Sequence, residues 1–473
     1  MAYHESMYFL VFLPVVLIGY QLAPKRVRFG VLLFFSYCFY FLFSHRLIVY
    51  LLGATTITYL TGRLVATGEK KRRKTILIVG VWLLLGMLLV MKYSGFFAEN
   101  VNALFGTINL GLRLPVRRFL LPLGISFYTL SAIGYMADVY WKKIEPEKNI
   151  AKLALFLSFF PIIMEGPICM YSDTAETLAK GEDIRSENLI RGYMRIGWGL
   201  LKKVVIADRL YVVVQTLFDG YASYHGVMIV VAAVSYTVQL YMEFSGCMDI
   251  ALGRWFKTYI FYPVSMSKLT RKWNRFAKKH TSKYIKLMVA SAIALFPVWV
   301  CNGLWHGANW SYLFYGMYYF VVIMIELMLE PAVKKLCAAW KIAEDAAWWN
   351  VLRILKTWVI IFTGELFFRA DTLGIGMHMF RSLFHDFSIQ KLWDGTLLTL
   401  GLGRVEIGII LVSLLIVGVV NHFREQQIDV RGVILQKRLP VRWLVYLALI
   451  FVVLIFGAYG PGYQEVDLIY AGF

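Results

Sequence analysis

Long apolar runs recur along the whole chain, and they constrain its fold more than any other feature. The runs lie at 5–22, 29–43, 46–60, 75–91, 118–141, 153–170, 193–217, 226–245, 287–305, 308–329, 351–368, 405–421 and 442–458. A helix needs about 20 residues to cross a bilayer, so these runs predict roughly 11 to 13 membrane segments, some of them re-entrant. We therefore expect an all-α polytopic membrane protein.

Composition favours a single membrane domain over residues 1–473. Hydrophobic residues make up 59% of the chain, which is too many for a string of soluble domains. The formal net charge of +20 falls into short loops between the apolar runs. That distribution is typical of basic residues held on the cytoplasmic side and argues against nucleic-acid binding. The five cysteines are scattered without metal-ligand spacing, so no metal site is expected.

The charges of the loops predict an orientation. Basic loops, expected in the cytoplasm, lie at 25–28, 70–74 and 142–152. The loop 171–190 is acidic and is expected outside. The stretch 254–286 carries ten lysines and arginines and no acidic residue, so it is expected in the cytoplasm. An odd number of membrane crossings must then connect the loop 171–190 with the stretch 254–286, although two apolar runs lie between them. We therefore interpret 193–217 as a re-entrant or surface-lying helix.

One polar stretch lies between two apolar runs, from Cys301 to Trp310. A histidine in a membrane segment is costly unless it has a partner or a task. Asn302 and His306 are four residues apart, so on a helix the amide could orient the imidazole. Gly303 and Gly307 would leave one side of the same helix bare for close approach. The alternative is a packed helix with one satisfied histidine.

Several stretches together resemble a known family. They are Leu-Pro-Leu-Gly-Ile-Ser-Phe-Tyr at 121–128, Asp-Val-Tyr at 138–140, Phe-Pro at 160–161, Tyr-Met-Glu-Phe-Ser-Gly-Cys-Met-Asp-Ile-Ala at 241–251, the stretch 302–310, and Phe-Phe-Arg-Ala at 367–370. This combination resembles the membrane-bound O-acyltransferase family, in particular its bacterial branch of alginate O-acetyltransferase-like proteins. The resemblance extends from about residue 5 to the C-terminus.

The resemblance implies a helical core with a channel, in the bacterial inner (cytoplasmic) membrane. It implies acyl transfer from a cytoplasmic thioester, acetyl-CoA or another, to an acceptor across the membrane, for O-acetylation of a cell-surface or exported polysaccharide. His306 matches the family's active-site histidine and would be the general base, with Asn302 and Trp305 in support. Membrane lipid and an extracytoplasmic acetyltransferase protein are the implied partners, and no bound cofactor is expected.

Two acids and one basic stretch are further candidates. Glu243 and Asp249 flank Ser-Gly at the end of an apolar run, where a carboxylate is a candidate substrate-binding or supporting group. Alternatively, they cap a helix end or pair with an arginine such as Arg254. The basic residues of 268–286 are interleaved with aromatic ones and could attract the phosphates of coenzyme A, or they simply mark a cytoplasmic loop.

The chain departs from the family pattern after Ala251. Family members carry a further segment here that ends in Trp-Arg-Arg-Trp-His and supplies a second histidine, whereas Gly253 is followed directly by Arg254. Nothing else in the sequence replaces that histidine, since His280 lies among lysines. Either the polypeptide lacks this segment, which would put its activity in doubt, or the printed sequence omits it. The resemblance to the family holds in both cases.

Two other functions stay open. One is D-alanyl transfer to teichoic acid, in which the donor is a carrier protein. The other is a transporter or lipid flippase, although the paired halves with broken helices that are common in transporters are not visible.

Overall fold

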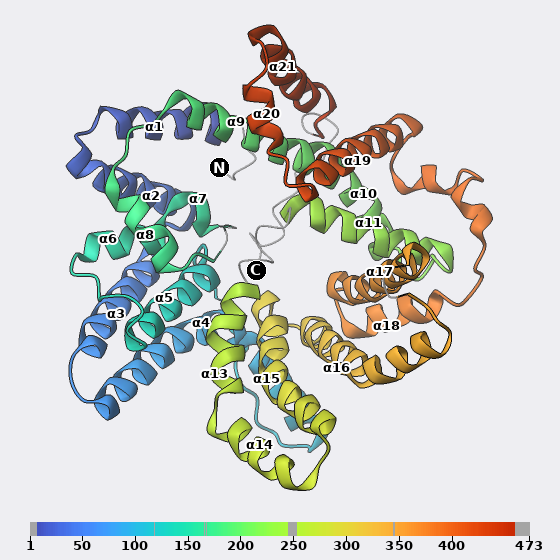
Figure 1. The fold of residues 1–473 in the computed structure, drawn as a ribbon, viewed down its shortest axis with the longest axis horizontal. Coiled ribbons are helices and arrows are strands. Elements are labelled where there is room, and N and C mark those ends of the chain that lie inside the picture. The colour runs from blue at the N-terminus through green and yellow to red at the C-terminus, as the bar shows by residue number, and fades with distance from the viewer. Residues whose placement is uncertain are drawn as a thin grey trace. The chain divides into compact units, whose positions relative to one another are not determined.

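The computed structural model describes residues 7–117, 119–164, 166, 168–244, 253–343 and 346–458. Every regular element within these ranges is a helix (Figure 1), which confirms the predicted all-α class. The chain divides into two compact units, each described by itself below. The first unit is Met1–Asp183, Cys247–Asn309 and Leu468–Phe473, and the second is Ile184–Gly246 and Trp310–Asp467. A single domain over 1–473 stays a prediction.

The first unit contains the N-terminal helices and the helix that ends in His306. Its elements are η1 (Tyr8–Phe12), α1 (Leu13–Leu22), η2 (Lys25–Val27), α2 (Arg28–Ser44), η3 (His45–Leu47), α3 (Ile48–Ala66), α4 (Lys70–Thr107), α5 (Ile125–Tyr140), α6 (Ile150–Ser158), α7 (Phe160–Ile163), α8 (Tyr171–Lys180), η5 (Lys257–Phe261), α13 (Tyr262–Ser265), α14 (Lys268–His280) and α15 (Lys283–His306). Buried side chains of α2, α3, α4 and α5 supply much of its core.

The second unit is also helical. Its elements are α9 (Ser186–Leu200), η4 (Leu201–Ala207), α10 (Asp208–Asp219), α11 (Val227–Phe244), α16 (Trp310–Ala339), α17 (Ala347–Arg369), α18 (Leu373–Ser382), η6 (Ile389–Leu392), η7 (Thr396–Leu400), α19 (Arg404–Glu425), α20 (Val430–Leu435) and α21 (Leu439–Phe456). Its core forms where α10, α11 and α17 meet, around buried residues such as Tyr236 and Phe368.

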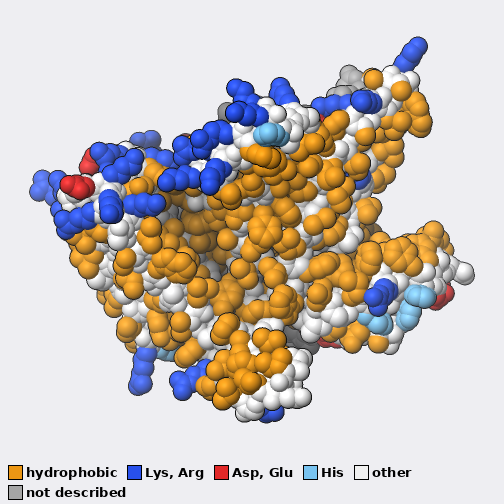
Figure 2. All heavy atoms as spheres, turned by 90° about the horizontal axis from the view of Figure 1, so that it is seen from below, with side chains coloured by type: hydrophobic (Ala, Val, Ile, Leu, Met, Phe, Trp, Pro, Cys, Tyr) orange, Lys and Arg blue, Asp and Glu red, His pale blue; other side chains and the backbone are white. Residues whose placement is uncertain are grey.

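The described helices include seven stretches that are long and apolar enough to cross a membrane. They are Lys25–Ala66, Lys70–Thr107, Val227–Phe244, Lys283–His306, Trp310–Ala339, Arg404–Glu425 and Leu439–Phe456. Other apolar runs form shorter helices such as α5 and α6, so this number is below the 11 to 13 segments predicted. Figure 2 shows hydrophobic side chains over most of the visible surface, as expected where a protein faces lipid. The chain is a multi-pass membrane protein.

Helix α5 begins at a position that only glycine fits. Gly124 has φ 66°, and a Cβ added there would lie 2.1 Å from the carbonyl oxygen of Ile163. A side chain would therefore meet both a disfavoured backbone conformation and the backbone of α7. This explains the glycine in Leu-Pro-Leu-Gly, and it fixes where α5 starts relative to α7.

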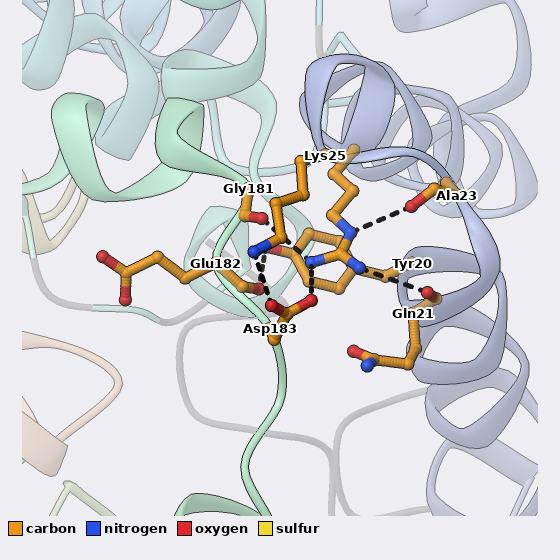
Figure 3. Close-up of polar contacts among 8 residues, drawn as sticks. Tyr20, Gln21, Ala23, Lys25, Gly181, Glu182 and Asp183 are labelled. Carbon is orange, nitrogen blue, oxygen red and sulfur yellow. Dashed lines mark hydrogen bonds and ion pairs between the residues drawn. The ribbon is translucent and has the colours of Figure 1, made fainter.

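The structure corrects the predicted orientation of the loop 171–190. Lys25 Nζ lies 2.6 Å from Asp183 Oδ2, and Arg28 Nη1 lies 2.8 Å from Asp183 Oδ1 (Figure 3). Hydrogen bonds from these two cations hold the pKa of Asp183 below its ordinary value. Further along, Arg254 Nη1 lies 2.8 Å from Asp173 Oδ2. The prediction that 171–190 faces away from the basic loops is wrong, because ion pairs cannot form across a bilayer.

The reason is that the apolar run 153–170 does not cross. Helix α6 has 9 residues, and at about 1.5 Å per residue it falls well short of a hydrocarbon core of about 30 Å. The chain then turns at Phe160, whose N–H donates to Ser36 Oγ at 3.2 Å. It returns to its starting side, where Tyr171 Oη donates to Glu147 Oε2 at 2.6 Å. The stretches 171–190 and 254–286 then lie on the same side, so the original reason for interpreting 193–217 as re-entrant disappears. That run nevertheless forms no candidate span within the described residues, so the interpretation stays a prediction.

Candidate active site around His306

His306 is the last residue of α15 and is buried, with 5% of its surface exposed. The Trp305 ring stands edge-on to the imidazole, with ring centroids 4.9 Å apart, and edge-on to Phe127 of α5 at 5.6 Å. Gly303 and Gly307 are also buried. The Leu-Pro-Leu-Gly-Ile-Ser-Phe-Tyr motif therefore reaches the candidate site through Phe127.

Helix α4 caps the end of α15 with two side chains. Lys92 Nζ donates to the carbonyl oxygen of Trp305 at 2.7 Å, and Tyr93 Oη donates to the carbonyl oxygen of Leu304. The last four carbonyls of a helix have no partner within the helix, and a cation near them also interacts favourably with the helix dipole. The two side chains therefore fix the backbone that carries His306.

Two helices show how far His306 lies from the basic loops. Arg73 Nη2 donates to the carbonyl oxygen of Tyr140 at 2.8 Å, so the basic end of α4 and the end of α5 lie together. From there α4 runs about 28 Å to Lys92, and α5 runs about 20 Å back to Phe127. The hydrocarbon core is about 30 Å thick. His306, which lies next to these contacts, is therefore far from the basic residues at the start of α4.

Sequence reasoning missed Lys92 and Tyr93. The predicted span ended at 91, whereas α4 continues to Thr107. A lysine at the end of an apolar run was the available signal, because a charge at that depth is a functional candidate. Asn302 is half-buried, four residues before His306 on the same helix. The hydrogen bonds of the described residues include none between these two side chains, so orientation of the imidazole by the amide stays a prediction.

Glu243 belongs to the second unit, where it pairs with a lysine. Lys203 Nζ lies 2.9 Å from Glu243 Oε1 and 2.9 Å from Asp208 Oδ1, and all three side chains are buried. Glu243 is therefore in an ion pair, as in the alternative interpretation, but its partner is Lys203 of the π-helix η4 and not Arg254, which pairs with Asp173. Asp249 lies outside the described residues.

Known proteins are similar in sequence to this chain over half of its length or more. A "probable alginate O-acetylase" of Pseudomonas syringae pv. tomato is 28% identical over 403 residues, covering 81% of this chain and 75% of the relative. A peptidoglycan O-acetyltransferase of Helicobacter pylori is 25% identical, covering 80% of this chain and 79% of the relative. A teichoic acid D-alanyltransferase of Bacillus subtilis is 24% identical, covering 52% of this chain and 68% of the relative. No family model matches the chain.

These relatives confirm the resemblance drawn from the motifs: the chain is a relative of the membrane-bound O-acyltransferases, and its class of enzyme is acyltransferase. Within that family, the long matches are to proteins named as O-acetylating enzymes. The match to the D-alanyltransferase is shorter.

Proposed function

We propose that this chain transfers acetyl groups from a cytoplasmic thioester, acetyl-CoA or another, to the hydroxyl of a polysaccharide acceptor on the other side of the inner membrane. The observation that carries the proposal is the buried His306, held by α4 and α5 at the end of α15. The names of the two relatives with long matches support a polysaccharide or peptidoglycan acceptor. An extracytoplasmic acetyltransferase protein is the proposed partner of the chain in this O-acetylation.

In the proposed reaction His306 acts as general base. Its neutral imidazole takes the proton of the acceptor hydroxyl while the hydroxyl oxygen attacks the thioester carbonyl carbon. The carbon–sulfur bond then breaks, an oxygen ester forms, and the departing thiolate receives the proton from the imidazolium. Trp305 packs edge-on against the imidazole and limits its rotation. Lys92 and Tyr93 hold the backbone on which it stands.

The distance of His306 from the basic loops suits this task. If the basic loops face the cytoplasm, as their charge predicts, the imidazole lies nearer the acceptor side. A thioester must then reach deep into the protein, while the acceptor needs only a short approach. This arrangement allows transfer across the membrane without either substrate crossing it.

The test is covalent transfer by the purified chain in proteoliposomes. We expect label from acetyl-CoA carrying radioactive acetyl to appear in ester linkage on an added polysaccharide. A D-alanyl carrier protein, tested in parallel, should give no ester. Ester formation only from the D-alanyl carrier would favour the second candidate, which the partial match to the Bacillus subtilis enzyme supports. Movement of label without any ester bond would instead indicate a transporter.

A further inference from the structure

Helix α14 presents three different faces around its axis. With about 3.6 residues per turn, Thr270, Trp273, Asn274 and Ala277 share the first face, where Thr270 and Ala277 are buried. This face packs on α15, and Trp273 Nε1 donates to the carbonyl oxygen of Lys286 at 3.1 Å. Helix α14 therefore lies against the first turn of a candidate membrane span.

The second face is strongly basic. It consists of Lys268, Arg271, Lys272, Arg275, Lys278 and Lys279, and all six residues are exposed. Five of them, with Asn274, line a surface hollow of about 630 Å³. In the described part of the chain no acidic side chain forms an ion pair with any of the six. Like charges at this spacing on a helix repel one another. The acidic side chains of the described residues do not offset that repulsion.

The third face is apolar and exposed. Leu269 and Phe276 are seven residues apart, on the flank next to the basic face, and they are 62% and 55% exposed. Where α15 begins, Lys283 is followed by the exposed Tyr284, Ile285 and Leu287. A basic face beside an exposed apolar flank, at the level where a span starts, is the pattern of a helix lying in the membrane interface.

We propose that α14 lies in the interfacial plane and binds anionic phospholipid headgroups with its basic face, while Leu269 and Phe276 enter the acyl region. The positive charge of the basic face favours anionic phospholipid, since the stretch 254–286 is expected on the cytoplasmic side and the cytoplasmic leaflet carries anionic lipids. The apolar flank favours phospholipid over a soluble phosphate such as that of coenzyme A. A phosphate group makes no favourable contact with exposed leucine and phenylalanine side chains, whereas the acyl chains of a lipid do. The inference does not depend on the reaction proposed above.

The first test measures lipid preference on the full chain in detergent, by native mass spectrometry with phosphatidylglycerol and phosphatidylcholine. The triple variant Lys272→Gln/Arg275→Gln/Lys279→Gln should lose at least about tenfold in relative affinity for phosphatidylglycerol, because each basic side chain near an anionic surface contributes about fivefold. The matched control Lys272→Arg/Lys279→Arg keeps the charge and should keep the preference. An unchanged preference in the Gln variant would overturn the proposal, as would binding of coenzyme A in place of the lipid.

The second test measures the position of the helix in reconstituted vesicles. A fluorophore on Phe276→Cys should be quenched by brominated lipid and shielded from aqueous iodide, and one on Lys272→Cys should show the reverse. These measurements use a chain whose native cysteines are replaced. Equal access of iodide to both positions would show that α14 stands clear of the membrane and would contradict the proposal.

Discussion

His306 is fixed mainly by residues of other helices. Two side chains of α4 satisfy carbonyl groups at the end of α15, and Phe127 of α5 packs against Trp305. A buried polar residue whose backbone is held at this many points has little freedom to move, which is what a proton-transferring group requires. Lys92 is therefore a positioning residue and needs no contact with substrate.

Lys92→Met should slow acetyl transfer while leaving the apparent donor affinity nearly unchanged. A hydrogen bond from a charged group contributes about 1.5–3 kcal/mol, so loss of the cap should lower kcat about tenfold or more. Lys92→Arg, which can still donate, should restore part of the rate. Steady-state kinetics separate kcat from KM. A folded Lys92→Met protein with normal kcat would show that the cap does not matter for turnover.

At the scale of elements, the sequence predicted helices well and their ends poorly. Apolar runs indicated where helices lie, because hydrophobicity over about 20 residues is a strong signal. The run 153–170 was predicted as a membrane segment, yet α6 and α7 together form a re-entrant turn. Phe160-Pro161 was visible in the sequence, but the contacts that return the chain, such as Tyr171 to Glu147, join residues far apart along it.

Gly124→Ala should prevent normal folding of the first unit. The substitution places a methyl group 2.1 Å from the Ile163 carbonyl oxygen at a positive φ, and strain and overpacking together should cost about 2–5 kcal/mol. Gly86→Ala is the matched control, because a Cβ there meets nothing within 4 Å. We expect the control to melt at or above the wild-type temperature in detergent. Equal melting of both variants would refute the tight contact between α5 and α7.

The contact between α2 and the loop after α8 is a second test at this scale. Arg28 is 4% exposed and donates to Gly181 O, Ala23 O and Gln21 O as well as to Asp183. Arg28→Met should therefore lower the melting temperature clearly, since it leaves several buried acceptors unpaired. Lys25→Met removes an exposed cation from the same carboxylate and should cost at most about 1 kcal/mol. The reverse order of melting temperatures would contradict the arrangement in Figure 3.

At the scale of the whole molecule, the orientation predicted from loop charges was wrong for the loop 171–190. The acidic residues of 171–190 suggested the outer side, but acidic residues weigh little in the positive-inside rule. Asp173 and Asp183 in fact serve as partners for basic residues from other loops. Local motifs in the sequence could therefore predict the family, and they single out His306 as the candidate base. It could not show these ion pairs, or the pairing of Glu243 with Lys203, which depend on residues distant in sequence.

Cysteine labelling tests this corrected topology. In a chain without its native cysteines, Glu182→Cys and Lys279→Cys should react with an impermeant maleimide from the same side of the membrane. Arg113→Cys should react from the opposite side, because α4 has 38 residues and crosses between Lys70 and Thr107. Reaction of positions 182 and 279 from opposite sides would contradict the ion pair between Asp173 and Arg254.

The central claim is that His306 is the base of an acyl transfer reaction. The most direct measurement compares acetyl transfer from a labelled acetyl thioester by wild type, His306→Ala, His306→Gln and the control His422→Ala, an exposed histidine on α19. We predict that both His306 variants lose about 10²–10⁴-fold in rate, since neither alanine nor an amide can take the proton. His422→Ala should match wild type. Transfer at the wild-type rate by a correctly inserted His306→Ala protein would contradict the account.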